Sequence, residues 1–411
     1  INYKSAHAAF LASKGDEGLA AWQNAPMLGN LKVIFDLPAV VINILITYLV
    51  YRGTKESKNF SNAMVYIKLA IIALVIIVGA FYIDIDNWTP FMPNGFSGVM
   101  GGVSAVFFAY IGFDAVSTLA EESKNPQRDL PKGMIYSLVI CTAVFIVLAL
   151  VITGMVSYEL LGVSDPLAEI FALKGVKWML FVVSIAAVVA MTSVLLVFQM
   201  GQPRIWMTMS RDGLMPKRFS RIHPKYKTPS YATLVTGLVV GLPIFFTDEN
   251  FVLDFTSIGT LFAFVLVCGG VLMLSPQSEA EIAERETKGK FRIPYVNSKF
   301  IFPAIVVVAV ALILKYVPDF FINVFDFSTG EKLATNIPML VFLIVCIVMT
   351  FVSFTKNLSL IPLLGLISCC YLLTGMAVSN WMWFGVWLVI GLVIYFTFSY
   401  KNSKLNTEVE H

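Results

Sequence analysis

The sequence has little charge, since only 13% of its 411 residues are Asp, Glu, Lys or Arg, whereas soluble domains contain about 25%. Hydrophobic residues make up 58% and the mean hydropathy is +0.80. A water-soluble fold of this composition would lack the polar surface needed to cover itself. The composition therefore excludes a soluble enzyme or a soluble nucleic-acid-binding domain, and it predicts that lipid surrounds most of the chain.

Metal ligands and phosphate-binding motifs are also scarce. There are three His and five Cys, and neither set shows the spacing of a zinc site or of a disulfide framework. We expect the cysteines to be small apolar side chains within apolar segments: Cys141, Cys268, Cys346, Cys369 and Cys370. The chain has no Gly-rich phosphate loop, so neither a metal site nor an organic cofactor is expected.

Long apolar runs are what the sequence does contain. A helix that crosses about 30 Å of hydrocarbon needs roughly 20 mostly apolar residues, and the runs lack the strict alternation of β-barrel strands. The fold class predicted is therefore an all-α polytopic membrane protein. Eleven segments qualify: 34–51, 61–82, 97–121, 133–156, 176–206, 230–247, 252–274, 300–316, 336–354, 358–377 and 379–399.

The distribution of Lys and Arg predicts the orientation. If the connection 52–59 is cytoplasmic, every second connection and the C-terminal tail together hold 21 of the 29 Lys and Arg residues when Arg204 is counted with its adjacent loop, as the positive-inside rule requires. Residues 1–33 are then an extracytoplasmic loop and 400–411 a cytoplasmic tail. An exported start with no secretory signal favours a chain from which an odd number of earlier helices is missing. We further expect a short amphipathic helix in the outer loop 157–173 and a solvated cytoplasmic segment at 278–290.

A few ionisable residues remain inside the predicted spans, at a cost of about 2.5–3.5 kcal/mol each near a helix centre. Lys68 lies about seven residues, or roughly 10 Å, from the basic loop. It either extends back to the headgroups or is a buried ammonium that releases and regains a proton. Asp114 is too short to reach the interface, so it either makes structural hydrogen bonds or faces water or a ligand. We expect Arg204 at the membrane interface.

The segment 97–121 also holds four glycines, Gly98, Gly101, Gly102 and Gly112. They predict either close packing between helices or a break in the helix. Broken helices in transporters expose backbone N–H and C=O groups near the bilayer midplane. Free carbonyls between residues 108 and 111 would accept hydrogen bonds from a substrate ammonium, and the Phe108 ring would contact its charge.

Two stretches resemble a known family. FFAYIGFDAVSTLAEESKNPQRDLPKG (107–133) and GQPRIWMTMSRDGLMPKRFSRIHPKYKTP (201–229) are similar to helix six and the end of helix eight, each with its following loop, in amino acid–polyamine–organocation superfamily transporters. WTPFMPNGFSG (88–98) and WFGVWLVIGLVIYF (383–396) are similar to the cationic amino acid transporter branch.

That resemblance implies a leucine-transporter-type fold, in which two inverted five-helix repeats form a core followed by extra helices. Residues 1–400 would then be a single transmembrane domain, with 34–274 part of the core and 300–399 the additional C-terminal helices. About 11 of 14 transmembrane helices would be present and the first three absent.

The resemblance also implies roles for individual residues. The substrate-binding segment would comprise Phe108, Ala109, Tyr110, Ile111 and Gly112, with Asp114 influencing the response to substrate or proton. Lys68 would occupy the position of a sodium site in proton-coupled relatives, near the hydroxyls of Thr192 and Ser193. The coupling ion would be a proton, with no other cofactor.

The function expected is an amino acid permease of the cell membrane. An enzyme is not expected, because no intramembrane His or paired carboxylates occur in the spans. Proton-coupled symport is the first hypothesis. The alternatives are an amino acid exchanger and a transporter-like protein that binds amino acids without moving them. The partners expected are an amino acid and the lipid bilayer, with no nucleic acid, while cationic and neutral substrates and the oligomeric state stay open.

Overall fold

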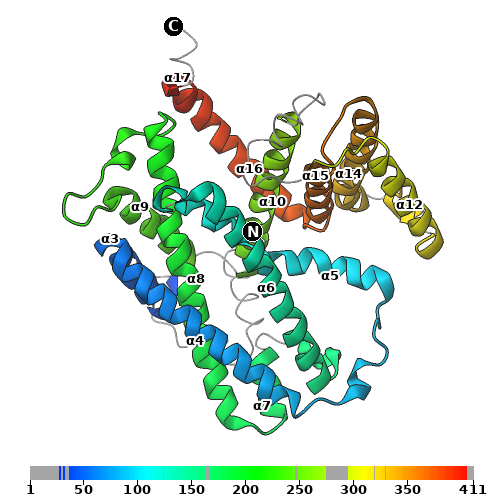
Figure 1. The fold of residues 1–411 in the computed structure, drawn as a ribbon, viewed down its shortest axis with the longest axis horizontal. Helices are drawn as coiled ribbons and strands as arrows, with labels where there is room; N and C mark the ends of the chain where they lie inside the picture. The colour runs from blue at the N-terminus through cyan, green and yellow to red at the C-terminus, as the bar shows by residue number, and fades with distance from the viewer. Residues whose placement is uncertain are drawn as a thin grey trace.

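The computed structural model describes residues 27–28, 31–32, 37–123, 125–162, 166–245, 249–274, 295–318, 320–328 and 330–404. Helices account for nearly all of the regular structure in these ranges (Figure 1). The single sheet there is a two-stranded antiparallel pair, β1 (Met27–Leu28) with β2 (Leu31–Lys32). The predicted all-α class is therefore confirmed.

The helices run through the whole described chain. The first half contains α3 (Leu37–Arg52), α4 (Thr54–Ala80), η1 (Ile85–Trp88), α5 (Gly95–Tyr110), η2 (Phe113–Glu122), α6 (Pro126–Met155), η3 (Tyr158–Leu161), α7 (Pro166–Leu173) and α8 (Lys177–Arg211). The second half contains η4 (Lys217–Ser220), α9 (Ser230–Gly241), η5 (Pro243–Phe245), α10 (Glu249–Met273), α12 (Ile301–Tyr316), α13 (Phe320–Val324), α14 (Gly330–Thr355), α15 (Leu360–Thr374), α16 (Val378–Ile394), the π-helical η6 (Tyr395–Ser399) and α17 (Tyr400–Asn402).

The membrane spans predicted from hydropathy correspond to these helices. Among the described residues, seven helices are long and apolar enough to cross a membrane, and four shorter apolar helices accompany them. Each of the eleven predicted segments coincides with one of these seven or four, so the chain is a multi-pass membrane protein. The inverted-repeat relation between the helices stays a prediction.

Two boundaries differ from the prediction for local reasons. The segment 97–121 is two elements, α5 and η2, and not one helix. The segment 230–247 leaves α-helical geometry at Gly241, just before Pro243, whose ring nitrogen has no N–H to donate to a helix. The predicted short helix in 157–173 is α7, with Ile170 and Phe171 buried, whereas the predicted segment 278–290 lies outside the described residues.

The helices form two groups that α5 connects. Figure 1 shows α3, α4, α6, α7, α8 and α9 together on one side, and α10, α12, α14, α15 and α16 on the other. In the first group α4 packs along α8, and in the second α10 packs along α15. Each group has its own buried apolar clusters, the larger of which joins α4, α6, α7 and α8.

The C-terminal end of the described chain docks on the loop after α8. The Ser399 hydroxyl donates to the carbonyl of Leu214 at 2.7 Å, and the Lys404 N–H donates to the carbonyl of Asp212 at 3.2 Å. Gly213 between them has φ +85°, and a Cβ there would collide with the backbone carbonyl of Asn402. Glycine is thus required at this junction both for its conformation and for the close approach.

The rest of the same loop packs on the end of α3. The Thr228 hydroxyl donates to the carbonyl of Tyr51 at 2.9 Å. His223 stacks on Tyr226, with ring centroids 4.8 Å apart, and the Arg52 guanidinium lies 5.7 Å from the centre of the Tyr226 ring. The stretch 201–229 that carries the family resemblance is therefore held by α3 at one end and by the C-terminal helices at the other.

Candidate functional site

The segment around residue 111 is where a predicted membrane helix is interrupted. The helix α5 ends at Tyr110, Ile111 is extended (φ −60°, ψ 133°), and η2 begins at Phe113. Gly112 has φ +115°, a conformation that costs a residue with a Cβ about 1–2 kcal/mol. The break predicted from the glycine and its neighbours is therefore confirmed.

The other glycines of this segment do not bring helices together. A Cβ added at Gly101 or Gly102 would meet nothing within 4 Å, and at Gly98 it would meet only the side chain of Asn94, one turn earlier. The alternative in which these glycines allow close helix packing is thus not supported at these three positions.

Asp114 makes a local hydrogen bond across the interruption. Its carboxylate Oδ1 accepts the N–H of Gly112 at 3.2 Å, and its backbone carbonyl accepts the hydroxyl of Ser117 at 2.6 Å. The side chain is half-buried. This geometry corresponds to the structural alternative for Asp114, in which a short acidic side chain satisfies orphan N–H groups where a helix begins.

The interruption leaves backbone acceptors available. The Phe108 carbonyl accepts the N–H of Ile111, and the Gly112 carbonyl accepts that of Ala115. Among the described residues, no such bond reaches the carbonyls of Ala109, Tyr110 or Ile111. These groups lie at the C-terminal end of α5, where the helix dipole is negative and favours a cation.

A cavity of about 500 Å³ borders the same segment. Three helices supply its walls, and the lining residues are Phe108, Ala109, Ile111, Val194, Phe198, Val252, Leu253 and Thr256. Its volume falls in the range of about 300–1,000 Å³ typical of small-molecule sites. Within these described lining residues, Thr256 provides the single polar side chain, so the walls are suited to an apolar group.

The predicted substrate-binding residues divide between this cavity and its surroundings. Phe108, Ala109 and Ile111 line it, and the Phe198 ring lies 3.7 Å from where a Cβ of Gly112 would be. Tyr110 instead faces α6, where its hydroxyl lies 3.1 Å from that of Thr142 and its ring packs edge-on against Phe145.

The walls from α8 and α10 were not predicted from the sequence. Val194, Phe198, Val252 and Leu253 are apolar residues within apolar spans, so neither charge nor a motif distinguishes them from residues that face lipid. The hydroxyl of Thr256 offers a weak signal at most, because Thr within a helix often bonds to its own backbone.

Lys68 and Ser193 are brought together by the packing of α4 along α8. The Lys68 ammonium donates to the Ser193 hydroxyl at 3.1 Å, and Ser193 is only 2% exposed. Among the described residues no carboxylate forms an ion pair with Lys68. Thr192 does not join this pair, since its hydroxyl donates to the carbonyl of Val188 one turn earlier in α8.

The location of Arg204 at the membrane interface stays a prediction, and the structure shows that its side chain is buried, at 9% exposed. The helix α8 continues to Arg211, five residues past the predicted end at 206, and η4 packs against it. The arginine is therefore surrounded by protein, and its position in the helix alone could not show this.

Asp254 is an ionisable residue that sequence reasoning overlooked. It lies in α10, and its carboxylate accepts the amide of Asn380 in α16 at 2.7 Å. Asn380 is 4% exposed. The acid lies near the start of a predicted span, where a charge is inexpensive, so the sequence offered little reason to single it out.

A set of buried side-chain hydrogen bonds joins α3, α8 and α9. The Gln199 amide donates to the Thr47 hydroxyl at 2.9 Å, that hydroxyl donates to the carbonyl of Asn43, and the Asn43 amide donates to the carbonyl of Gly237. Such bonds hold helices together in lipid, where apolar burial provides no driving force. These hydrogen bonds are a structural feature of the helix group that contains Lys68.

Comparison with known families identifies the class of membrane protein to which the chain belongs. A family model described as amino acid permease matches residues 28–348, and a model of the C-terminus of amino acid permeases matches residues 358–403. The chain belongs to the amino acid permease family, which is a family of transporters and not of enzymes. The resemblance found in the two sequence stretches is thereby confirmed.

Individual relatives are known from bacteria and plants. The chain is 36% identical to the branched-chain amino acid permease BcaP of Bacillus subtilis, covering 91% of this chain and 66% of the relative. It is 35% identical to the methylthioribose transporter of Bacillus subtilis, with the same coverage. It is 40% identical to cationic amino acid transporter 9, chloroplastic, of Arabidopsis thaliana, over 68% of this chain and 49% of the relative. The chain thus spans two thirds of these relatives or less.

Proposed function

We propose that this chain provides the substrate-binding interruption and much of the helical scaffold of an amino acid permease. The observation that carries the proposal is the break between α5 and η2, which borders a cavity of about 500 Å³. Alternating access would move one helix group against the other around this break, as in transporters built from discontinuous helices.

The carbonyls of Ala109, Tyr110 and Ile111 support a role in holding an α-ammonium group. They lie at the negative end of α5 without a described N–H donor, so a substrate ammonium would supply the missing donors. The substrate side chain would then extend into the adjacent cavity.

The walls of that cavity favour a neutral, apolar amino acid over a cationic one. Phe108, Ile111, Val194, Phe198, Val252 and Leu253 border the space, and a charged side chain placed against them without a counter-ion would be costly. Asp114 is engaged by Gly112. The relative named as a branched-chain amino acid permease agrees with this choice, whereas the cationic amino acid transporters represent the alternative.

Uptake into proteoliposomes tests the substrate class. We expect leucine, isoleucine and valine to compete with labelled leucine, and arginine to compete poorly. Val194→Trp, which fills the cavity, should abolish leucine uptake. Val188→Trp is the matched control, because Val188 lies on the same helix at 54% exposure and does not line the cavity. Stronger competition by arginine than by leucine would refute the proposed class.

For energy coupling we propose proton symport with Lys68 as the group that exchanges the proton. Its contact with the buried Ser193 supports an ammonium held between α4 and α8 rather than one extended to the headgroups. Exchange of one amino acid for another is the alternative. Leucine uptake driven by a pH gradient into vesicles that contain no amino acid separates symport from exchange, since an exchanger requires internal substrate.

A protein that binds amino acids without moving them is the remaining alternative, and substrate binding without measurable flux would identify it. For location we propose the cell membrane with residues 400–411 in the cytoplasm, on the basis of the Lys and Arg distribution. Some relatives are named as vacuolar or chloroplastic. Labelling of a cysteine introduced near residue 402, in intact and in permeabilised cells, tests the orientation.

A further inference from the structure

The loop that follows α8 concentrates positive charge. Residues 211–229 contain six Lys and Arg residues but a single acidic residue, Asp212. The helix α8 has 35 residues, which is a length of about 52 Å at 1.5 Å per residue, whereas the hydrocarbon of a bilayer is about 30 Å thick. The end of α8 therefore extends past the hydrocarbon, so the loop begins at the level of the lipid headgroups.

The C-terminal end of the described chain brings further cations to this loop. The Ser399 hydroxyl donates to the carbonyl of Leu214, and the Lys404 N–H donates to the carbonyl of Asp212. Figure 1 shows α17 reaching the connection between α8 and α9. Lys401 and Lys404 therefore lie beside the basic loop, and two segments that are far apart in the sequence form one surface.

The loop is anchored beneath its charged side chains. The Phe219 ring packs edge-on against Trp206, with ring centroids 5.4 Å apart, and against Tyr231 at 5.1 Å. The two residues just before Phe219 in η4, Lys217 and Arg218, are exposed. The aromatic contacts thus hold the backbone in place while the cations face outward.

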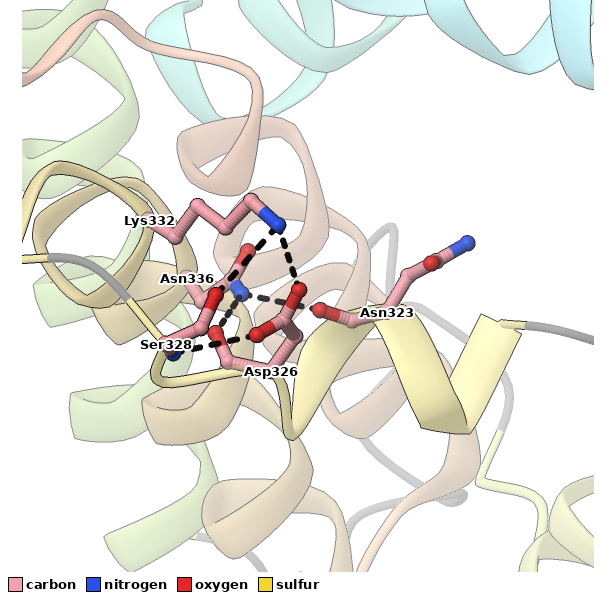
Figure 2. A network of polar contacts seen from close by, with 5 residues as sticks. All are labelled: Asn323, Asp326, Ser328, Lys332 and Asn336. Atoms are coloured by element: carbon pink, nitrogen blue, oxygen red, sulfur yellow. Dashed lines mark hydrogen bonds and ion pairs between the residues drawn. The ribbon is translucent and has the colours of Figure 1, made fainter.

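The exposed cations of this surface have no acid to neutralise them. The following are exposed and form no ion pair with a described residue: Lys217, Arg218, Arg221, Lys225, Lys227, Lys401 and Lys404. Among the described residues the one ion pair lies elsewhere, between Lys332 and Asp326, whose charged atoms are 2.6 Å apart (Figure 2). Cations gathered without counter-ions repel one another and attract an anionic partner.

Exposed apolar side chains lie among these cations. Ile222 follows Arg221 directly and is 47% exposed, and Tyr400 precedes Lys401 and is 52% exposed. Apolar and aromatic side chains beside Lys and Arg are typical of protein surfaces that lie in the membrane interface. A soluble polyanion would gain nothing from them, so the surface fits an anion that belongs to the bilayer.

We propose that the loop 217–227 and the segment 401–404 together bind the headgroups of anionic phospholipids in the adjoining leaflet. The lipid phosphates supply the counter-ions that the protein lacks here, and Ile222 and Tyr400 enter the boundary between headgroups and acyl chains. The surface uses neither the break between α5 and η2 nor Lys68, so the inference does not rest on the proposed transport.

Native mass spectrometry of the delipidated, detergent-purified protein tests this surface. The probes are dioleoylphosphatidylglycerol, which is anionic, and dioleoylphosphatidylcholine, which has the same chains and a zwitterionic headgroup. We expect the anionic lipid to bind about 25-fold more tightly, which is the effect of two Lys or Arg residues at an anionic membrane surface. The preference should weaken as salt is added. Equal affinities for the two lipids would overturn the proposal.

Two neutralising variants locate the binding. The loop variant combines Lys217→Gln, Arg218→Gln and Arg221→Gln, and the tail variant combines Lys401→Gln and Lys404→Gln. Each should lower the affinity for phosphatidylglycerol by about 5-fold or more and leave the affinity for phosphatidylcholine unchanged. An unchanged affinity for phosphatidylglycerol in either variant would show that the two segments do not act together, and it would overturn the joint surface.

The matched control combines Lys177→Gln and Lys315→Gln. Both lysines are exposed and lie at other helix ends, and the Lys315 ammonium lies 5.4 Å from the centre of the Tyr316 ring, much as Lys225 lies 5.6 Å from that of Tyr226. The control should keep the wild-type preference. An equal loss in the control would mean that any exposed cation suffices, which would overturn the specific surface.

A soluble competitor identifies the source of the anion. Glycerophosphoglycerol is the headgroup of phosphatidylglycerol without its acyl chains. We expect it not to displace the bound lipid at equal concentration, because the apolar contacts of Ile222 and Tyr400 require the lipid. Displacement by glycerophosphoglycerol would instead identify a site for a soluble anion and overturn the phospholipid.

Discussion

The cavity at the interruption and the cavity between α14 and α16, both among the described residues, differ in how the backbone around them is built. At the break between α5 and η2 the helix is interrupted, and three carbonyls have no described backbone donor. At the C-terminal cavity, α14, α15 and α16 are continuous where they line it, and most of the lining side chains are apolar. An interrupted backbone offers several polar groups to a zwitterion, whereas continuous helices satisfy their own backbone and offer mainly apolar side chains.

The largest effect is expected at the coupling residue of the first region. Lys68→Ala should abolish leucine uptake driven by a pH gradient, because the ammonium that contacts Ser193 is then lost. Uptake into proteoliposomes with an imposed pH gradient measures this. Lys177→Ala is the matched control, since Lys177 is an exposed residue at the start of α8. Normal gradient-driven uptake in Lys68→Ala would remove the residue from the mechanism.

The next largest effect is expected at the interruption itself. Gly112→Ala should destabilise the protein by about 1–2 kcal/mol, because a Cβ is disfavoured at φ +115°. A steric clash is not the cause of this loss of stability, since the added Cβ would contact only Phe198, at an ordinary 3.7 Å. Thermal unfolding in detergent measures the change.

Gly101→Ala is the control for this comparison within the same helix. A Cβ there would meet nothing within 4 Å, and Ala is the better helix former. The variant should therefore be neutral or slightly stabilising. An equal loss in both variants would show that α5 responds to any added methyl group and not to the conformation of Gly112.

A smaller effect separates the two roles considered for Asp114. Asp114→Ala should cost about 1 kcal/mol, as expected for a lost helix cap, because Oδ1 accepts the Gly112 N–H. Asp114→Asn keeps an acceptor oxygen and should retain stability in the same unfolding assay. If Asp114→Asn instead shifts the pH dependence of uptake while stability is unchanged, the negative charge has a role in transport beyond the cap.

The smallest effect is expected at the loop before α14. The hydrogen bond from Lys332 holds the pKa of the Asp326 carboxyl below its ordinary value. Because the folded-state pKa is lowered, the stabilisation is present above the unfolded pKa of about 3.9 and is lost as pH falls below it. The pair is exposed, so the effect is small and decreases with salt.

Unfolding temperatures measured at pH 7 and near pH 3.5 test this pair. Asp326→Asn should reduce the difference between the two temperatures, whereas Asp86→Asn, in η1 and far along the chain from this network, should leave it unchanged. A pH dependence that is identical in the wild type and in Asp326→Asn would contradict the contribution of the pair.

The sequence predicted the spans and the break better than it predicted the cavity walls. Spans are marked by length and hydropathy, and the break by Gly112 beside Asp114, so both can be recognised locally. Residues such as Val194 and Leu253 line the first cavity only because α8 and α10 meet there, which is a property of tertiary packing. The same holds for Arg204, whose burial depends on what covers the end of α8.

The structure brings together only some of the residues for which the resemblance implied a role. Lys68 and Ser193 meet, whereas Thr192, one residue away, bonds to its own helix, because successive residues of a helix point about 100° apart. Tyr110 is similarly rotated away from the cavity that Ala109 and Ile111 line. A motif can identify a turn of helix as functional, but the rotation of that turn is set by its neighbours.

The contact between the chain's last described helices and the loop after α8 offers a way to observe movement of the two helix groups. Ser399 and Leu214 are 185 positions apart in sequence, yet they share a hydrogen bond of 2.7 Å, beside a glycine that admits the backbone of Asn402. A fluorophore attached at residue 402 would therefore sense displacement of the α8 loop. Its emission during the addition of leucine would report, from outside the binding region, whether the two helix groups change their relative position.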